Sequence, residues 1–280
     1  MTLLRADILN ATIATDGLSV RRRVAYGAAS RQAMDIWRPA GDAAGLPVVI
    51  FFYGGAWQNG RRQDYPFVAA PLARLGMVVA VADYRVFPQV RYPAFIEDAA
   101  RAVATVRREA RGWGGDPDRV IVTGHSAGAY IAAMLALDPC WLAAAGEDRA
   151  HLAGMVGLAG PYDFLPIQDE DVRAVFSSAA DLPETQPVAH VDGRNPPMLL
   201  LHGAADTTCY PRNTLALAAR VRAAGGTVEA RLYPGVGHIG IVIGMAPLFR
   251  FTSPVFRDFS GFVLAGGVPG KCRHPGRGGL

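Results

Sequence analysis

Lysine is almost missing from this chain of 280 residues, because Lys271 is the only one among 28 basic side chains. The others are arginines, and the formal net charge is +4. The densest basic runs, at 21–23 and 271–277, lack the interleaved aromatic residues that are typical of a nucleic-acid surface. We interpret these runs as solvated faces and expect no nucleic-acid partner.

Cysteine is also scarce, with Cys140, Cys209 and Cys272 odd in number and far apart. This spacing suits neither a disulfide framework nor a zinc site built from paired neighbouring ligands. The metalloprotease pattern H-E-x-x-H is absent as well. We therefore expect reduced thiols and no bound metal.

Long uninterrupted apolar runs are missing too. Asp7 and several polar residues interrupt the first 18 residues, where a signal peptide needs a continuous apolar core. No window reaches the length of a membrane span. We expect a cytoplasmic protein without a membrane partner.

What the chain does contain is a regular alternation of apolar runs and helical stretches. Continuous apolar runs of this kind are typical of parallel strands buried on both faces, and the alternation predicts an α/β fold with helices on both faces of the sheet. The first 40 residues instead show short alternating runs, at 18–26 and 32–37, which predict antiparallel strands at one edge. The expected parallel strands lie at 48–52, 77–81, 120–122, 155–158, 198–201 and 228–233, and the expected helices at 94–109, 127–137, 213–224 and 255–264.

The composition predicts one domain over residues 1–265. Hydrophobic residues make up 51% of the chain and charged residues 19%, and no interior linker divides it. Residues 161–197 break the alternation with prolines and an acidic stretch, so we expect a cap or insertion over the strand ends, where α/β folds bind ligands. Residues 266–280, rich in Gly, Pro and Arg, are expected to form a disordered basic tail.

The sequence G-H-S-A-G at 124–128 follows the pattern G-x-S-x-G. A predicted strand at 119–123 precedes it, and a helical run at 129–137 follows. Small residues at both ends of the pattern permit a sharp turn that lifts the serine hydroxyl into a cleft. The setting predicts that Ser126 is a catalytic nucleophile.

A serine hydroxyl needs a histidine to accept its proton and an acid to orient that histidine. Of six histidines, His238 lies just after the last predicted strand, where this topology places the base. Asp206 lies in the loop after the preceding strand and is the expected acid. Asp163, one strand earlier, is the competing acid. The chain order Ser126, Asp206, His238 differs from the orders of chymotrypsin-type and subtilisin-type proteases.

The loop after the strand at 48–52 has the sequence Y-G-G-A-W at 53–57. Its small residues let backbone N–H groups approach a reacting carbonyl. We expect the N–H groups of Gly55, Ala56 and Ala127 to form an oxyanion hole.

These motifs together resemble α/β-hydrolase carboxylesterases related to hormone-sensitive lipase and arylformamidase, whose H-G-G-x-W loop is matched at 53–57. Further resemblance lies in D-Y-R at 83–85 and G-G-D-P at 114–117. The resemblance implies the α/β-hydrolase fold and two substrate-binding residues, Trp57 lining the pocket and Tyr130 packed behind the nucleophile, with a plain core role as the equal alternative. Tyr53 stands where the family usually has histidine, which leaves the bracing of the loop open.

We expect a serine hydrolase that cleaves small-molecule carboxylic esters with short, medium or aryl acyl groups, through an acyl-enzyme and without a cofactor. An arylformamidase-like amide hydrolase uses the same machinery and stays an alternative. A catalytically inactive ligand-binding homologue would not require a complete triad. The pattern G-x-G-x-x-G at 235–240 does not indicate dinucleotide binding, because no buried strand with a terminal acid follows it.

Overall fold

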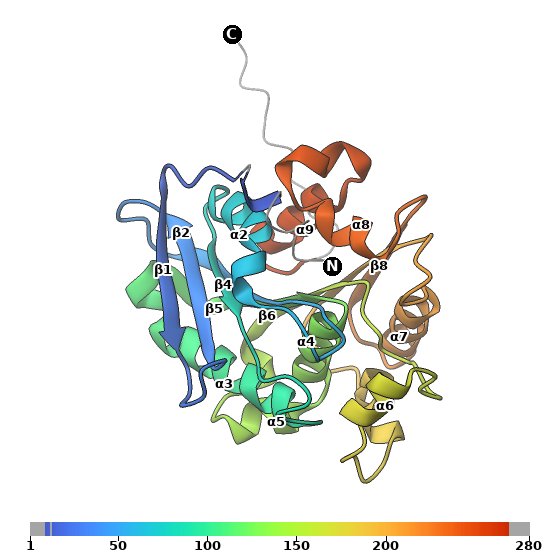
Figure 1. Cartoon of the computed structure of the whole chain (residues 1–280). Helices are drawn as coiled ribbons and strands as arrows, with labels where there is room; N and C mark the ends of the chain where they lie inside the picture. Colours follow the sequence, from blue (N-terminus) through green and yellow to red (C-terminus); the bar gives the residue numbers. More distant parts are fainter. Residues whose placement is uncertain (1–8, 12, 269–280) are drawn as a thin grey trace.

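A central sheet of eight strands organises the molecule (Figure 1). The computed structural model describes residues 9–11 and 13–268. The strand order is β1-β2-β4-β3-β5-β6-β7-β8, in which β1 and β2 are antiparallel to their neighbours and the others are parallel. The strands are β1 Leu18–Ala25, β2 Ala33–Pro39, β3 Leu46–Phe52, β4 Val78–Ala82, β5 Gly115–His125, β6 Leu152–Leu158, β7 Met198–Gly203 and β8 Val228–Tyr233.

Helices cover both faces of this sheet, with α2 and α9 on one side and α3 and α4 on the other (Figure 1). The apolar runs of the sequence explain the layering, because every residue of β4 is buried and β3 is buried from its second residue onward. The predicted α/β architecture and its antiparallel edge are confirmed. The helices are α2 Pro66–Ala73, α3 Ala94–Glu109, α4 Ala127–Leu137, α5 Pro139–Ala144, α6 Glu170–Val175, α7 Arg212–Ala223, α8 His238–Ile243 and α9 Val255–Leu264.

The segment 161–197 forms α6 and two short 3-10 helices, Pro183–Thr185 and Pro187–His190. It packs beside α4, where the Tyr130 hydroxyl donates to the Thr185 carbonyl at 2.7 Å. None of the residues that line the cavity described below comes from this segment. It therefore supports the aromatic core beside the site and forms no wall of that cavity.

The expected basic tail lies outside the described residues from 269 onward. Within the described part of the chain, no helix combines the length and the apolar character needed to cross a membrane.

Parallel strands bring their carboxyl ends to one edge of the sheet, so the loops after β3, β5, β7 and β8 meet there. Those loops carry, in the same order, the Y-G-G-A-W sequence at 53–57, Ser126, Asp206 and His238. The topology thus assembles residues that are more than 100 positions apart in the chain.

Candidate active site

The turn between β5 and α4 holds Ser126 in a strained backbone conformation, with φ 54° and ψ −121°. A Cβ atom at Gly124 would lie 2.3 Å from the Gly128 carbonyl carbon, and one at Gly128 would lie 2.0 Å from the Phe52 oxygen. Only glycine fits at either position without a backbone shift. The Ser126 N–H donates to the Leu158 carbonyl at 2.9 Å, which ties the turn to β6.

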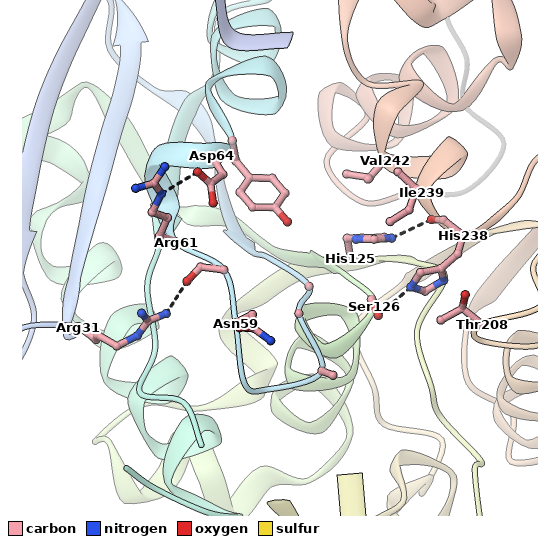
Figure 2. A pocket seen from close by; sticks show the side chains of 15 residues that line it. Arg31, Asn59, Arg61, Asp64, His125, Ser126, Thr208, His238, Ile239 and Val242 are labelled. Carbon is pink, nitrogen blue, oxygen red and sulfur yellow. Dashed lines mark hydrogen bonds and ion pairs between the residues drawn. The ribbon is translucent and has the colours of Figure 1, made fainter. Parts of the chain in front are cut away.

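A continuous hydrogen-bond chain joins Ser126, His238 and Asp206. His238 Nε2 lies 3.0 Å from Ser126 Oγ, and His238 Nδ1 lies 2.7 Å from Asp206 Oδ2 (Figure 2 shows the first pair). A carboxylate only accepts, so the Nδ1–H donates to Asp206 and Nε2 is left to accept the serine proton. Asp163, the competing acid, is exposed and forms no hydrogen bond or ion pair with His238 among the described residues.

Asp206 is buried, and four donors surround its carboxylate. Oδ1 accepts from the N–H groups of Thr208 and Cys209, both at 2.9 Å, while Oδ2 faces His238 and lies 3.2 Å from His202 Nε2. Burial alone would raise the pKa of Asp206, but the hydrogen bonds from His202 and His238 outweigh it and hold the pKa well below the usual value. The Asp206 carboxylate is therefore charged at neutral pH.

His202 is a functional neighbour that the sequence reasoning missed. It is fully buried, with Nδ1 2.7 Å from Thr214 Oγ1 and Nε2 2.7 Å from the Cys209 carbonyl. Because that carbonyl only accepts, the proton sits on Nε2, which also points at Asp206. Its position four residues before the acid was the one signal in the sequence.

His125 forms a hydrogen bond with the backbone of His238. Burial, assisted by the neighbouring His238, lowers the pKa of His125 to about 3, so its ring is neutral. Its Nε2 lies 3.0 Å from the His238 carbonyl, to which it donates, and the two ring centroids are 4.9 Å apart. The variable residue of the G-x-S-x-G pattern thus fixes the start of α8.

The loop after β3 exposes the backbone donors that the sequence predicts. Gly55 has φ 136° and a Cβ there would lie 2.3 Å from the Asn59 oxygen, so this turn requires glycine. Ala56 follows with φ 51°. Within the described residues, the N–H groups of Gly55, Ala56 and Ala127 donate to no acceptor, and Gly55 and Ala56 line a cavity with Ser126.

Tyr53 braces this loop in place of the histidine usual for the family. Its hydroxyl donates to Asp83 Oδ1 and accepts from Arg31 Nη2, both at 2.8 Å. The ring stacks between Tyr65 and Tyr84, with centroids 5.5 and 4.9 Å away. Burial and the Asp83 charge raise the pKa of Tyr53 well above its ordinary value, so the phenol keeps its proton.

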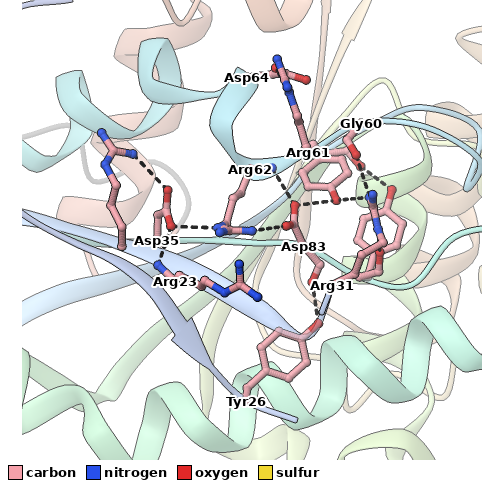
Figure 3. Close-up of polar contacts among 12 residues, drawn as sticks. Arg23, Tyr26, Arg31, Asp35, Gly60, Arg61, Arg62, Asp64 and Asp83 are labelled. Carbon is pink, nitrogen blue, oxygen red and sulfur yellow. Dashed lines mark hydrogen bonds and ion pairs between the residues drawn. The ribbon is translucent and has the colours of Figure 1, made fainter. Parts of the chain in front are cut away.

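A buried ionic network anchors the far end of the same loop. The Arg62 guanidinium binds Asp35 at 2.8 Å and also contacts Asp83, and the Arg62 N–H donates to Asp83 at 2.6 Å (Figure 3). Arg62, Asp35 and Asp83 are each less than 10% exposed. The network ties the loop to β2 and to the segment after β4, which are distant in sequence.

A cavity of about 810 Å³ opens above Ser126. One wall carries Ser126, His238 and the apolar side chains of Ile239 and Val242 (Figure 2). The opposite wall is polar, with Asn59, Arg61, Asp64 and Arg31 (Figure 2). Among the described residues, no group of three or more His, Cys, Asp or Glu side chains is placed to hold a metal ion.

Trp57 and Tyr130, expected to bind substrate, do not line this cavity. They are 3% and 0% exposed, and their ring centroids are 5.1 Å apart. Phe176 and Phe164 pack against both rings and close the cluster on the side of the 161–197 segment. Of the two alternatives, the structure favours the core role for both residues, because aromatic rings fill the space around them.

Solved structures with the same architecture identify the fold. A truncated carbohydrate esterase from gut microbiota superposes with a TM-score of 0.77 at 21% identity, over 91% of this chain and 98% of that one. Esterase 2 from Thermogutta terrifontis gives a TM-score of 0.72 at 25% identity, over 92% and 96%. The fold is that of the α/β-hydrolases.

Within that class the chain belongs to the BD-FAE family, a group like hormone-sensitive lipase whose model matches residues 34–221. Isoprenylcysteine alpha-carbonyl methylesterase from Arabidopsis thaliana is 29% identical over 88% of this chain and 62% of its own length. Esterase LipC from Mycobacterium tuberculosis is 34% identical over 78% and 59%. The chain spans about three fifths of the length of these curated relatives.

Proposed function

We propose that this protein hydrolyses carboxylic esters, with Ser126 as the nucleophile, His238 as the general base and Asp206 as the acid that orients it. The observation that carries the proposal is the unbroken hydrogen-bond chain from Asp206 through His238 to Ser126. Relatives named as a methylesterase and as esterases support ester chemistry over other acyl transfers.

In the acylation step, Ser126 Oγ attacks the ester carbonyl while its proton moves to His238 Nε2. The carbonyl oxygen becomes an oxyanion, for which the unpaired N–H groups of Gly55, Ala56 and Ala127 are the donors. Collapse breaks the bond to the alcohol, which leaves with the proton from His238. Each donor of this kind contributes about 3 kcal/mol of transition-state stabilisation.

In the second step a water molecule gives its proton to His238 and attacks the acyl-enzyme, which releases the acid and restores Ser126. The charged Asp206 stabilises the imidazolium formed in both steps. The substrates are small-molecule esters with short, medium or aryl acyl groups, a size that a cavity of about 810 Å³ admits.

The test is the hydrolysis rate of 4-nitrophenyl esters from acetate to decanoate, together with N-formylkynurenine, for the wild type and Ser126→Ala. Ester turnover that disappears in Ser126→Ala supports the proposal. Ser177→Ala is the matched control, because its exposed hydroxyl donates only to the Ala174 carbonyl. Turnover of the formamide alone would instead make the protein an amide hydrolase, and full ester turnover by Ser126→Ala would refute the mechanism.

A further inference from the structure

One guanidinium faces the cavity without a carboxylate partner. Arg31 lines the cavity together with Ser126 (Figure 2). It donates from Nε to the Tyr84 carbonyl at 2.9 Å, and from Nη2 to the Tyr53 hydroxyl at 2.8 Å and the Gly60 carbonyl at 2.6 Å. All three acceptors are neutral. Across the described residues Arg31 forms no ion pair, and its Nη1 group donates to no acceptor.

The acids near this wall are already paired with other arginines. Asp64 binds Arg61 at 2.8 Å inside the cavity, which makes a locally neutral pair. Asp83 reaches Arg31 only through the Tyr53 hydroxyl and is bound directly by Arg62. Among the described residues of the polar wall, Arg31 is therefore the arginine whose positive charge has no carboxylate partner.

The place of Arg31 relative to the nucleophile suits substrate recognition. Ser126 and His238 lie on one wall with apolar neighbours, while Arg31 lies across the loop that carries the oxyanion donors (Figure 2). An ester whose carbonyl sits at Ser126 can extend one of its two halves toward Arg31. A guanidinium with two free N–H bonds on one nitrogen is suited to a carboxylate.

We infer that Arg31 binds a carboxylate carried by the substrate, so that the enzyme selects anionic esters over neutral esters of the same shape. This inference rests on the proposed ester hydrolysis. The carboxylate belongs either to the acyl half, as in a monoester of a dicarboxylic acid, or to the alcohol half, as in an acylated hydroxybenzoate. Both share the same recognition chemistry, and two pairs of substrates distinguish them.

The experiment measures kcat/KM for two matched pairs at neutral pH. The acyl pair is 4-nitrophenyl hydrogen adipate and 4-nitrophenyl hexanoate, and the alcohol pair is 4-acetoxybenzoate and 4-acetoxybenzamide. In at least one pair, the wild type should prefer the anionic member by about tenfold, the size expected for one charge-assisted hydrogen bond. The preference should fall as salt rises from about 0.05 to about 0.5 M, because salt screens the attraction.

Arg31→Met should bring this ratio to about one, whatever it does to the absolute rates, and Arg31→Lys should keep part of it. The ratio of kcat/KM values within a pair separates binding of the substrate carboxylate from bracing of the loop. Loss of the hydrogen bonds from Arg31 to Tyr53 and Gly60 would slow hydrolysis of the anionic and the neutral ester alike. Arg220→Gln is the matched control, since it removes one charge from an exposed position of α7 outside the cavity lining and should keep the preference.

Equal kcat/KM within both pairs for the wild type would overturn the inference and leave ester hydrolysis standing. An unchanged preference in Arg31→Met would overturn it too, and would reduce Arg31 to a brace. Failure of the wild type to hydrolyse even the neutral esters would refute the proposed function itself, and the inference with it.

Discussion

At the scale of single residues, the charge on Asp206 decides which nitrogen of His238 can act as a base. The carboxylate fixes the proton on Nδ1 and so frees Nε2 for Ser126. His202, Thr208 and Cys209 donate toward the same carboxylate and keep it ionised. The hydrogen-bond directions thus support the proposed roles of His238 as the base and Asp206 as the residue that orients it.

Asp206→Asn should lower kcat for 4-nitrophenyl butyrate by about 10³- to 10⁴-fold, because an amide can hold His238 in the wrong tautomer. The fold should remain, as judged by circular dichroism. The matched control is Asp163→Asn, at the competing acid, which is exposed and should leave kcat within about twofold. If kcat falls severely in Asp163→Asn and not in Asp206→Asn, then Asp163 is the acid of the triad and Asp206 is not.

The low pKa of Asp206 also predicts how stability responds to acid. The pKa of Asp206 is lower in the folded than in the unfolded chain. Its charge therefore contributes stability above the ordinary aspartate pKa of about 3.9. This contribution is lost as the pH falls through the pKa that Asp206 has in the folded chain. Urea unfolding from about pH 6 down to about pH 3 should therefore show a shrinking difference in the free energy of unfolding between wild type and Asp206→Asn. A difference that grows toward low pH would contradict the assignment.

At the scale of elements, two backbone turns carry Ser126 and the proposed oxyanion donors Gly55 and Ala56. The elbow between β5 and α4 has no room for side-chain atoms at Gly124 or Gly128, since both would collide with backbone. The loop after β3 requires glycine at Gly55 for the same reason. Such contacts make the two turns mutually dependent, because the Phe52 oxygen that excludes a Cβ at Gly128 lies at the start of that loop.

Gly128→Ala should reduce the free energy of unfolding by about 1–3 kcal/mol, because backbone atoms must move to admit the methyl group. It should also lower kcat, since the movement displaces Ser126. Gly112→Ala is the control, for its added Cβ meets nothing within 4 Å. Chemical denaturation and ester assays on both variants measure the two effects. Equal free energies of unfolding for Gly128→Ala and Gly112→Ala would show that the turn at Gly128 has room for a methyl group.

The network around Arg62 should matter more to stability than any surface ion pair. Arg62→Met leaves the buried Asp35 and Asp83 short of a partner, and we expect a loss of about 3–5 kcal/mol in the free energy of unfolding. Arg173→Met breaks an exposed pair with Glu170 and should cost at most about 1 kcal/mol. Urea denaturation of both variants measures the difference. If Arg62→Met leaves the free energy of unfolding nearly unchanged, the network around Arg62 does not hold the loop.

The elements that sequence predicted well are those with local signals. The apolar runs at 48–52 and 77–81 correspond to β3 and β4, because burial on both faces leaves no polar residue in them. The elbow could be predicted because G-x-S-x-G is a short contiguous pattern, although the backbone atoms that exclude side chains at its glycines include the distant Phe52 oxygen. The 161–197 segment offered no periodic pattern, so its packing beside α4 instead of over the cavity was not predictable.

At the scale of the whole molecule, the site exists because a parallel sheet gathers four loops at one edge. Chain order and topology were therefore enough to nominate Ser126, Asp206 and His238. Three features could not be predicted from the sequence, because each depends on contacts between segments that come together only in the folded sheet. They are the hydrogen bonds by which Tyr53 braces its loop, the contact of His202 with Asp206, and the lack of a carboxylate partner for Arg31 among the described residues. For Trp57 and Tyr130 the sequence left the substrate-binding and core roles equally open for the same reason, and an aromatic cluster from several elements buries both residues.

The measurement that tests the central claim most directly is covalent labelling of the nucleophile. The protein is incubated with a 4-nitrophenyl alkylphosphonate, which phosphonylates an activated serine and releases 4-nitrophenol, and the product is analysed by intact mass and peptide mapping. We predict one adduct per chain, on Ser126, formed far more slowly in Asp206→Asn and absent in Ser126→Ala. An adduct on another residue, or labelling of Ser126→Ala at the wild-type rate, would contradict this prediction.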